Sequence, residues 1–209
     1  MKNILCFGDS NTFGTNPSGG RWPRDQRWPG ILQERLGNEF YVIEEGLGGR
    51  TAAAEDFLEG DKNGQRHLPI ALRSHRPLDL VILMLGTNDL KHRIGLLPRD
   101  IAAGVEQLGR MVETYDYGPH YPVPHVLLIS PIFIGDSVED SPFYGFSADA
   151  AAASRQLASL YSTQAKAHGW LYLDAASVAG PSDLDQLHME ACGHRALAEA
   201  VEAVVRNHF

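Results

Sequence analysis

The stretch MKNILCFGDSNTFG (residues 1–14) opens the chain with an apolar run from Ile4 that stops abruptly at Gly8-Asp9-Ser10. A short apolar run bounded by turn-forming residues is typical of a buried β-strand. Glycine, aspartate and serine in a row are first of all turn formers, so the triplet by itself does not mark a functional site. Its meaning depends on which residues stand at the ends of the other strands of the chain.

Four further apolar runs have the composition of strands and alternate with amphipathic stretches. We expect strands at 4–8, 41–46, 79–85, 125–130 and 170–174, and helices at roughly 28–37, 66–75, 98–115, 147–168 and 189–207. Strands that are continuously apolar are buried on both faces, as in a parallel sheet covered by helices. The sequence therefore predicts one three-layer α/β domain over residues 1–209, with a five-stranded parallel sheet.

Composition limits the partners that the chain can have. Its 18 basic and 26 acidic residues give a formal net charge of -8, which repels nucleic-acid phosphates and anionic membrane surfaces. The apolar run from Ile4 to Phe7 is too short for a signal peptide, and no later run has the length of a membrane-spanning helix. Cys6 and Cys192 have no partner at the spacing of a zinc or redox motif. We expect a cytoplasmic protein with two buried, reduced thiols and no nucleic-acid or membrane partner.

Glycine-rich and polar segments lie near the ends of the expected strands. In an open parallel sheet, ligands bind beyond the carboxyl ends of the strands. Four segments are placed this way: Gly8-Asp9-Ser10, GLGGRT (46–51), GTND (86–89) and DQLH (185–188). The catalytic groups are therefore expected among them.

A serine hydroxyl becomes an effective nucleophile when a base takes its proton. His188 can be that base, because Asp185 lies three residues earlier and can accept the Nδ1 proton of the imidazole, which leaves Nε2 to face Ser10. Donors to the oxyanion of an ester transition state are available from the glycine-rich backbone at 48–49, the Asn88 amide and the Ser10 N–H. These residue types together favour acyl transfer through a serine nucleophile.

The blocks GDSNTFG (8–14), Gly49, GTND (86–89) and DQLH (185–188) resemble those of the SGNH, or GDSL, hydrolase family, in the same order. CFGDS, VIEEGLGGRT and DLVILMLGTND resemble its bacterial arylesterase and acyltransferase branch. The resemblance implies a flavodoxin-like strand order, a catalytic triad of Ser10, His188 and Asp185, and an oxyanion hole formed by the Ser10 N–H, the Gly49 N–H and the Asn88 side chain. It also implies short acyl esters of aryl or small alcohols as substrates, and assembly into homo-oligomers.

Several other polar residues have structural interpretations. Gly135-Asp136-Ser137 repeats the triplet, but the charges of Glu139 and Asp140 would oppose an oxyanion, so we interpret it as a turn. Asp9 adjoins the nucleophile and is expected to hold the turn through local N–H groups, and Asp89 is assigned to loop structure.

Residues 188–194, HMEACGH, contain four possible metal ligands. A helical metal pair has histidines at i and i+4, whereas six residues separate His188 from His194. We therefore expect no metal and no cofactor, and we place His194 on the surface of the last helix.

The loops 14–27 and 131–147 are rich in Gly, Pro, Asp and aromatic residues, as expected of segments that line a site. The aromatic residues in or beside them include Trp22, Trp28, Phe133, Phe143, Tyr144 and Phe146, and Phe13 directly precedes the first loop. We expect Phe13, Trp22 and Phe143 in the substrate pocket and Trp28 in helix packing.

The function that the residues favour most is a serine esterase that hydrolyses short acyl esters and can also transfer the acyl group. Two alternatives stay open: an esterase that deacetylates carbohydrates, and a catalytically idle module that binds a small ligand. The chain has no G-x-S-x-G, the nucleophile motif of α/β-hydrolases. A dinucleotide loop at 46–51 is a weak interpretation, because Thr51 stands at the third glycine position.

Overall fold

The computed structural model describes residues 1–143 and 145–209, so Tyr144 of the expected site loop lies outside the described residues. One sheet contains five strands, all parallel, in the order β2-β1-β3-β4-β5. The strands are β1 (Lys2–Gly8), β2 (Phe40–Gly46), β3 (Leu80–Met84), β4 (His125–Ser130) and β5 (Leu171–Asp174). The predicted five-stranded parallel sheet is confirmed.

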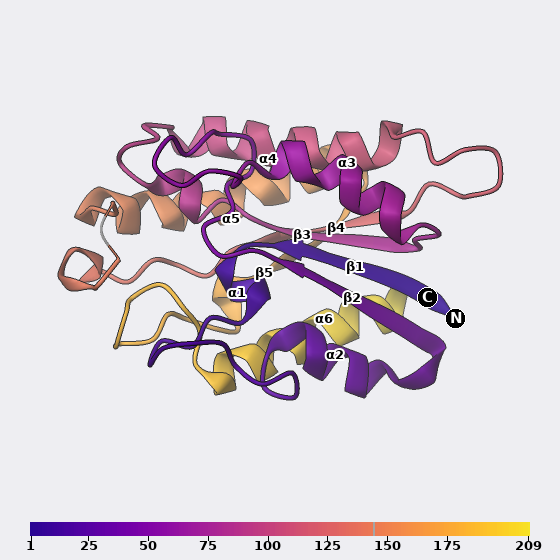
Figure 1. Cartoon of the computed structure of the whole chain (residues 1–209), viewed down its shortest axis with the longest axis horizontal. Coiled ribbons are helices and arrows are strands. Elements are labelled where there is room, and N and C mark those ends of the chain that lie inside the picture. Colours follow the sequence, from indigo (N-terminus) through magenta and orange to yellow (C-terminus); the bar gives the residue numbers. More distant parts are fainter. Residues whose placement is uncertain (144) are drawn as a thin grey trace.

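Helices cover both faces of the sheet (Figure 1). The helices of eight or more residues are α2 (Trp28–Leu36), α3 (Gly64–His75), α4 (Pro98–Thr114), α5 (Ala148–His168) and α6 (Ala191–His208). One apolar core joins the sheet to α3, α4 and α5, and a second joins its other face to α2 and α6. This is the three-layer α/β architecture that the sequence predicts.

Burial differs between the middle and the edges of the sheet. Every residue of β3 is buried, as the continuous apolar run LVILM requires. The edge strands β2 and β5 are partly exposed, and Tyr41 in β2 is 52% exposed. The expectation of strands buried on both faces therefore holds for the central strands and is wrong for the edges, where one side of the strand has no neighbour.

One short helix, α1 (Ser10–Phe13), was not predicted. Asp9 is its N-cap: Oδ1 accepts a hydrogen bond from the N–H of Asn11 at 3.0 Å. The expected structural role of Asp9 is thereby confirmed. Ser10 is consequently the first residue of a helix that begins directly after β1, where the sheet ends.

Two expectations about α6 are wrong. His194 is 0% exposed and its Nδ1 accepts the main-chain N–H of Trp28 at 3.3 Å, whereas Cys192 is exposed. Positions two residues apart on a helix are separated by about 200°, so turning position 194 toward α2 turns position 192 toward solvent. Trp28 itself is fully buried, which confirms its expected packing role.

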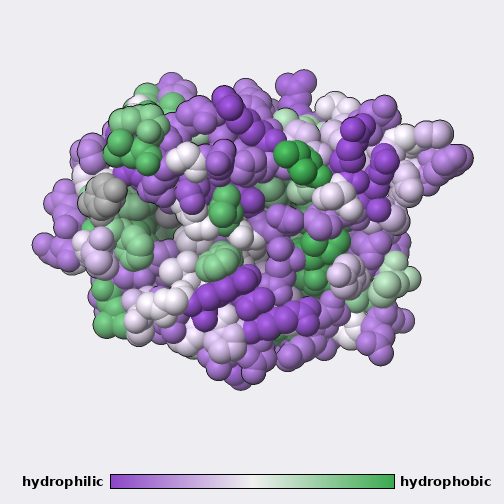
Figure 2. Space-filling model, viewed as in Figure 1, coloured by the Kyte–Doolittle hydropathy of each residue, from purple (hydrophilic) through white to green (hydrophobic). Residues whose placement is uncertain are grey.

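The face of the molecule in Figure 2 is mainly hydrophilic, with hydrophobic side chains in separate patches. Within residues 1–143 and 145–209, no helix has the length and apolar character needed to cross a membrane. The same part of the chain contains no group of three or more His, Cys, Asp or Glu side chains arranged to hold a metal ion.

Candidate active site

A cavity of about 260 Å³ lies beyond the carboxyl end of the sheet and brings together residues from distant parts of the chain. Its described lining consists of Ser10, Thr15, Gly48, Gly49, Glu59, Thr87, Asn88, Lys91, Pro142, Phe143, Phe146, Leu187 and His188. The expected nucleophile, base and oxyanion residues therefore share one cavity, at the sheet edge where ligands bind in parallel α/β folds.

His188 is oriented by Asp185. The Nδ1 atom of the imidazole lies 2.7 Å from Oδ2 of Asp185, and both side chains are buried. Burial opposes ionisation of this carboxyl group, but hydrogen bonds from the His188 ring and from two main-chain N–H groups hold the pKa of Asp185 below its ordinary value. An ionised Asp185 fixes the imidazole tautomer in which Nδ1 carries the proton, so Nε2 is the atom that can accept one.

The segment 187–189 lies outside helices and strands, yet the N–H and C=O of each residue are hydrogen-bonded. The N–H groups of Leu187 and His188 donate to Asp185 Oδ1 at 3.0 and 2.9 Å, and the N–H of Met189 donates to Asn11 Oδ1 at 3.0 Å. The carbonyl of Leu187 accepts from Asn11 Nδ2 at 3.1 Å. The carbonyl of His188 accepts from the N–H of Ser182 at 2.7 Å, and that of Met189 accepts from Trp22 Nε1 at 3.2 Å. Side chains thus supply most of the bonds that regular secondary structure would supply elsewhere.

The glycine loop after β2 is held close to Asn88. Gly49 has a φ of 79°, a conformation that favours glycine. The Asn88 amide donates one hydrogen bond to the carbonyl of Arg50 at 3.1 Å, and an amide nitrogen carries a second proton that stays available for a ligand. The guanidinium of Arg50 in turn donates to the carbonyl of Gly8 at 2.9 Å and stacks on Phe7, with 4.0 Å from its central carbon to the ring centroid.

Asp89 holds the loop after β2 in place through its buried carboxyl group. Both of its carboxylate oxygens accept the main-chain N–H of Ala52, at 3.0 and 2.9 Å, which ties the segment after β3 to the loop after β2. The expected structural role of Asp89 is thereby confirmed, although the residue lies in a short 3-10 helix (Asn88–Leu90) and not in an irregular loop. Burial raises the pKa of Asp89 to about 7, although the hydrogen bonds from main-chain N–H groups act to lower it.

With this geometry in place, comparison with known proteins is decisive: residues 6–196 match the GDSL-like lipase/acylhydrolase family. The chain belongs to this family. Est24, a carbohydrate acetylesterase from Sinorhizobium meliloti, is 34% identical over 100% of both chains, with a TM-score of 0.93. The aryl esterase of M. smegmatis is 38% identical over 99% of both chains, with a TM-score of 0.91. A search of curated proteins gave no match. The resemblance seen in the sequence is confirmed, and this GDSL-like chain is a carboxylic ester hydrolase.

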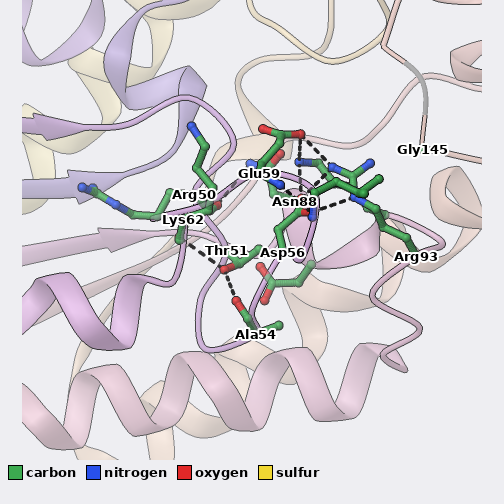
Figure 3. A network of polar contacts seen from close by, with 12 residues as sticks. Arg50, Thr51, Ala54, Asp56, Glu59, Lys62, Asn88, Arg93 and Gly145 are labelled. Carbon is green, nitrogen blue, oxygen red and sulfur yellow. Dashed lines mark hydrogen bonds and ion pairs between the residues drawn. The ribbon is translucent and has the colours of Figure 1, made fainter.

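One wall of the cavity in this GDSL-like hydrolase is charged, because Glu59 and Lys91 line it. Figure 3 shows Glu59 in one network of polar contacts with Asp56 and Arg93. Glu59 Oε1 lies 2.9 Å from Lys91 Nζ and 2.7 Å from a terminal nitrogen of Arg93. Asp56 pairs with the same two cations at 3.0 and 2.6 Å and is itself fully buried. Burial opposes ionisation of Glu59, but Lys91 and Arg93 hold its pKa below the ordinary value, so a carboxylate faces the cavity at neutral pH.

The three expected pocket residues are placed differently. Phe143 lines the cavity. Phe13 and Trp22 are not among the described lining residues. The guanidinium carbon of Arg21 lies 4.0 Å from the centroid of the Phe13 ring, and Trp22 Nε1 donates to the carbonyl of Met189. The interpretation of these two as pocket residues is therefore corrected: Phe13, the last residue of α1, stacks with Arg21, and Trp22, in the loop after α1, bonds the main chain.

Sequence reasoning missed Asn11, Glu59 and Lys91. Asn11 left a signal, since it is a short polar residue directly after the nucleophile and is 3% exposed in the structure. Glu59 and Lys91 left none, because each is an ordinary charged residue in a loop or at a loop boundary until the fold brings them together.

Proposed function

We propose that this hydrolase is a serine esterase that uses Ser10, His188 and Asp185 to cleave short acyl esters of aryl or small alcohols. The observation that carries the proposal is that Ser10, Asn88 and His188 line the same cavity, and that His188 is hydrogen-bonded to a buried Asp185. The aryl esterase of M. smegmatis, 38% identical to this chain, supports the choice of aryl esters.

In the proposed mechanism, Ser10 Oγ attacks the carbonyl carbon of the ester while His188 Nε2 accepts the hydroxyl proton. The Gly49 N–H, the Ser10 N–H and the Asn88 amide donate hydrogen bonds to the oxygen that becomes negatively charged. The bond to the alcohol then breaks, and His188 returns the proton to the leaving oxygen. Water repeats these steps on the acyl-enzyme and releases the acid.

Acyl transfer follows from the same intermediate when an alcohol replaces water. Pro142, Phe143, Phe146 and Leu187 give the cavity an apolar wall, which favours an organic acceptor over water. The measurement is the ratio of benzyl acetate to acetate formed from p-nitrophenyl acetate in the presence of benzyl alcohol. Release of acetate alone would contradict transfer.

The decisive test of the esterase uses p-nitrophenyl acetate with the wild type, Ser10→Ala and Ser137→Ala. The second triplet, Gly135-Asp136-Ser137, makes Ser137 a matched control in a turn. We expect Ser10→Ala to lower kcat by about 10⁴-fold and Ser137→Ala to leave it unchanged. An inactive wild type that still binds the ester would favour the idle binding module, and an active Ser10→Ala would exclude Ser10 as the nucleophile.

A carbohydrate ester is the second candidate substrate, and the charged wall favours it. Among the described residues that line the cavity, Glu59 is the one carboxylate, and a carboxylate accepts hydrogen bonds from sugar hydroxyls. Est24, 34% identical, is a carbohydrate acetylesterase. We expect Glu59→Gln to raise KM for an acetylated monosaccharide about tenfold and to leave KM for p-nitrophenyl acetate unchanged.

Glu55→Gln is the control for that experiment, because Glu55 belongs to the same loop and is exposed outside the cavity. Equal effects of Glu59→Gln on both substrates would show that the charged wall supports the loop and does not select the alcohol.

We also propose that the protein forms homo-oligomers. Phe57 and Leu58 are neighbours in the chain and are 73% and 58% exposed, and grouped exposed apolar side chains are typical of surfaces that another chain covers. Size-exclusion chromatography with light scattering gives the mass directly. A monomer at all concentrations would contradict this proposal without affecting the proposed chemistry.

A further inference from the structure

The side chain of Asn11 bonds the main chain on both sides of His188. Its Nδ2 donates to the carbonyl of Leu187 at 3.1 Å, and its Oδ1 accepts the N–H of Met189 at 3.0 Å. All of these groups are buried. Asn11 follows Ser10 directly in α1, so one amide connects the segment of the expected nucleophile to the segment of the expected base across more than 170 positions of sequence.

Asp185 cannot make this connection. It lies in the same loop as His188 and bonds that residue and Leu187, so it orients the imidazole within its own loop. Trp22 does reach the carbonyl of Met189, but it lies twelve positions after Ser10, beyond the turn at the end of α1. Asn11 is adjacent to the nucleophile, and its two bonds fix the separation of the two backbones as well as their orientation.

The carboxamide is suited to this task because it offers a donor and an acceptor in one plane, as a peptide group does. The family name GDSL places a leucine after the Gly-Asp-Ser triplet, whereas this chain has Asn11 there. A leucine of similar size would leave the buried carbonyl of Leu187 and the buried N–H of Met189 without these partners.

We propose that Asn11 is a positioning residue that sets the distance between Ser10 and His188 for proton transfer. The inference rests on the proposed function, since it assumes that these two residues exchange the proton. A misplacement of about 1 Å between reacting groups costs about 100-fold in rate, so loss of the two bonds is expected to lower kcat more than substrate binding.

The test compares Asn11→Leu with Gln33→Leu. Gln33 is a matched control outside the cavity: its Oε1 accepts the N–H of Val42 at 2.8 Å, and its Nε2 donates to the carbonyls of Gly37 and Phe40. We expect Asn11→Leu to lower kcat for p-nitrophenyl acetate by about 10- to 100-fold while KM changes less than about threefold. Gln33→Leu is expected to lower the Tm and to leave kcat unchanged.

Titration with diethyl p-nitrophenyl phosphate separates positioning from loss of folded protein. The amount of p-nitrophenol released counts folded sites, and the rate constant reports how readily the serine is activated. We expect Asn11→Leu to release the same amount of p-nitrophenol as the wild type, with a rate constant that is lower by the same factor as kcat. If Asn11→Leu does not fold, the same measurements are made on Asn11→Asp. This variant keeps the shape of the side chain and the acceptor for the Met189 N–H, but it loses the donor to the Leu187 carbonyl.

A folded Asn11 variant with kcat within about twofold of the wild type would overturn the inference, as would an equal loss of kcat in Gln33→Leu. Failure of the proposed function looks different, because the wild type would then be inactive or Ser10→Ala would keep its activity. With an active wild type and an inactive Ser10→Ala, normal kcat in the Asn11 variants refutes the positioning role alone.

Discussion

The ring of Phe143 lies edge-on to the imidazole of His188, with ring centroids 5.0 Å apart and an interplanar angle of 72°. His188 protonates the leaving alcohol in the proposed mechanism, so Phe143 lies where an aryl alcohol would leave. We expect Phe143→Ala to raise KM for p-nitrophenyl acetate by about three- to tenfold, with a smaller effect on kcat. Phe133→Ala is the control, because Phe133 is in the same loop but outside the described lining. Equal effects of the two variants would contradict this prediction.

Replacing Asp185 tests the orientation of the base. Asp185→Asn keeps the shape of the side chain but removes the charge that holds the His188 tautomer. We expect kcat to fall by about 10³- to 10⁴-fold. Asp183→Asn, an exposed carboxylate of the same loop, is expected to leave kcat unchanged. A loss below about tenfold in Asp185→Asn would mean that His188 does not depend on this carboxylate.

The adjacent glycines of the loop after β2 are expected to respond differently to alanine. At Gly49, φ is 79° and an added Cβ would lie 2.7 Å from Oε2 of Glu59. At Gly48, an added Cβ would meet no atom within 4 Å. Gly49→Ala should therefore displace the expected oxyanion donor and lower kcat by about 10-fold or more, while Gly48→Ala retains it. Steady-state kinetics with both variants is the measurement, and equal activities would argue against a donor at Gly49.

Asp89 is expected to make stability depend on pH. Burial raises its pKa from 3.8 to about 7, so between these values the folded chain binds this proton more tightly than the unfolded chain. The stabilisation is complete at low pH and is lost as pH rises through about 7. Asp89→Asn keeps an acceptor for Ala52 but does not titrate. Its Tm relative to the wild type should rise between about pH 5 and about pH 8, and a constant difference would show that Asp89 does not titrate there.

The order of strands and helices could be predicted because it depends on local properties of the chain. The run LVILM at Leu80–Met84 is apolar enough to be a central strand in any arrangement that buries it. Boundaries moved by a few residues where a capping interaction decides them: α3, predicted from residue 66, begins at Gly64 because Asn63 caps it by accepting the N–H of Gln65. The edge strand β2 was predicted as a strand, but its exposure depends on the absence of a neighbour on one side, which no local pattern contains.

For the site, the sequence by itself determined which residue types stand near the strand ends: a serine after β1, a histidine with a carboxylate three residues earlier, and glycine and amide donors after other strands. These could be found because spacing within a loop is a local property, and because parallel strands all end at one edge. Tertiary structure alone decided that Trp22 donates a hydrogen bond to the carbonyl of Met189 and that Glu59 pairs with Lys91 in the cavity wall. It also decided that Asn11 bonds the main chain on both sides of His188. Each of these contacts joins residues whose separation is fixed by the packed sheet and its loops, so the side chains involved show no periodicity and no spacing that a linear pattern could reveal.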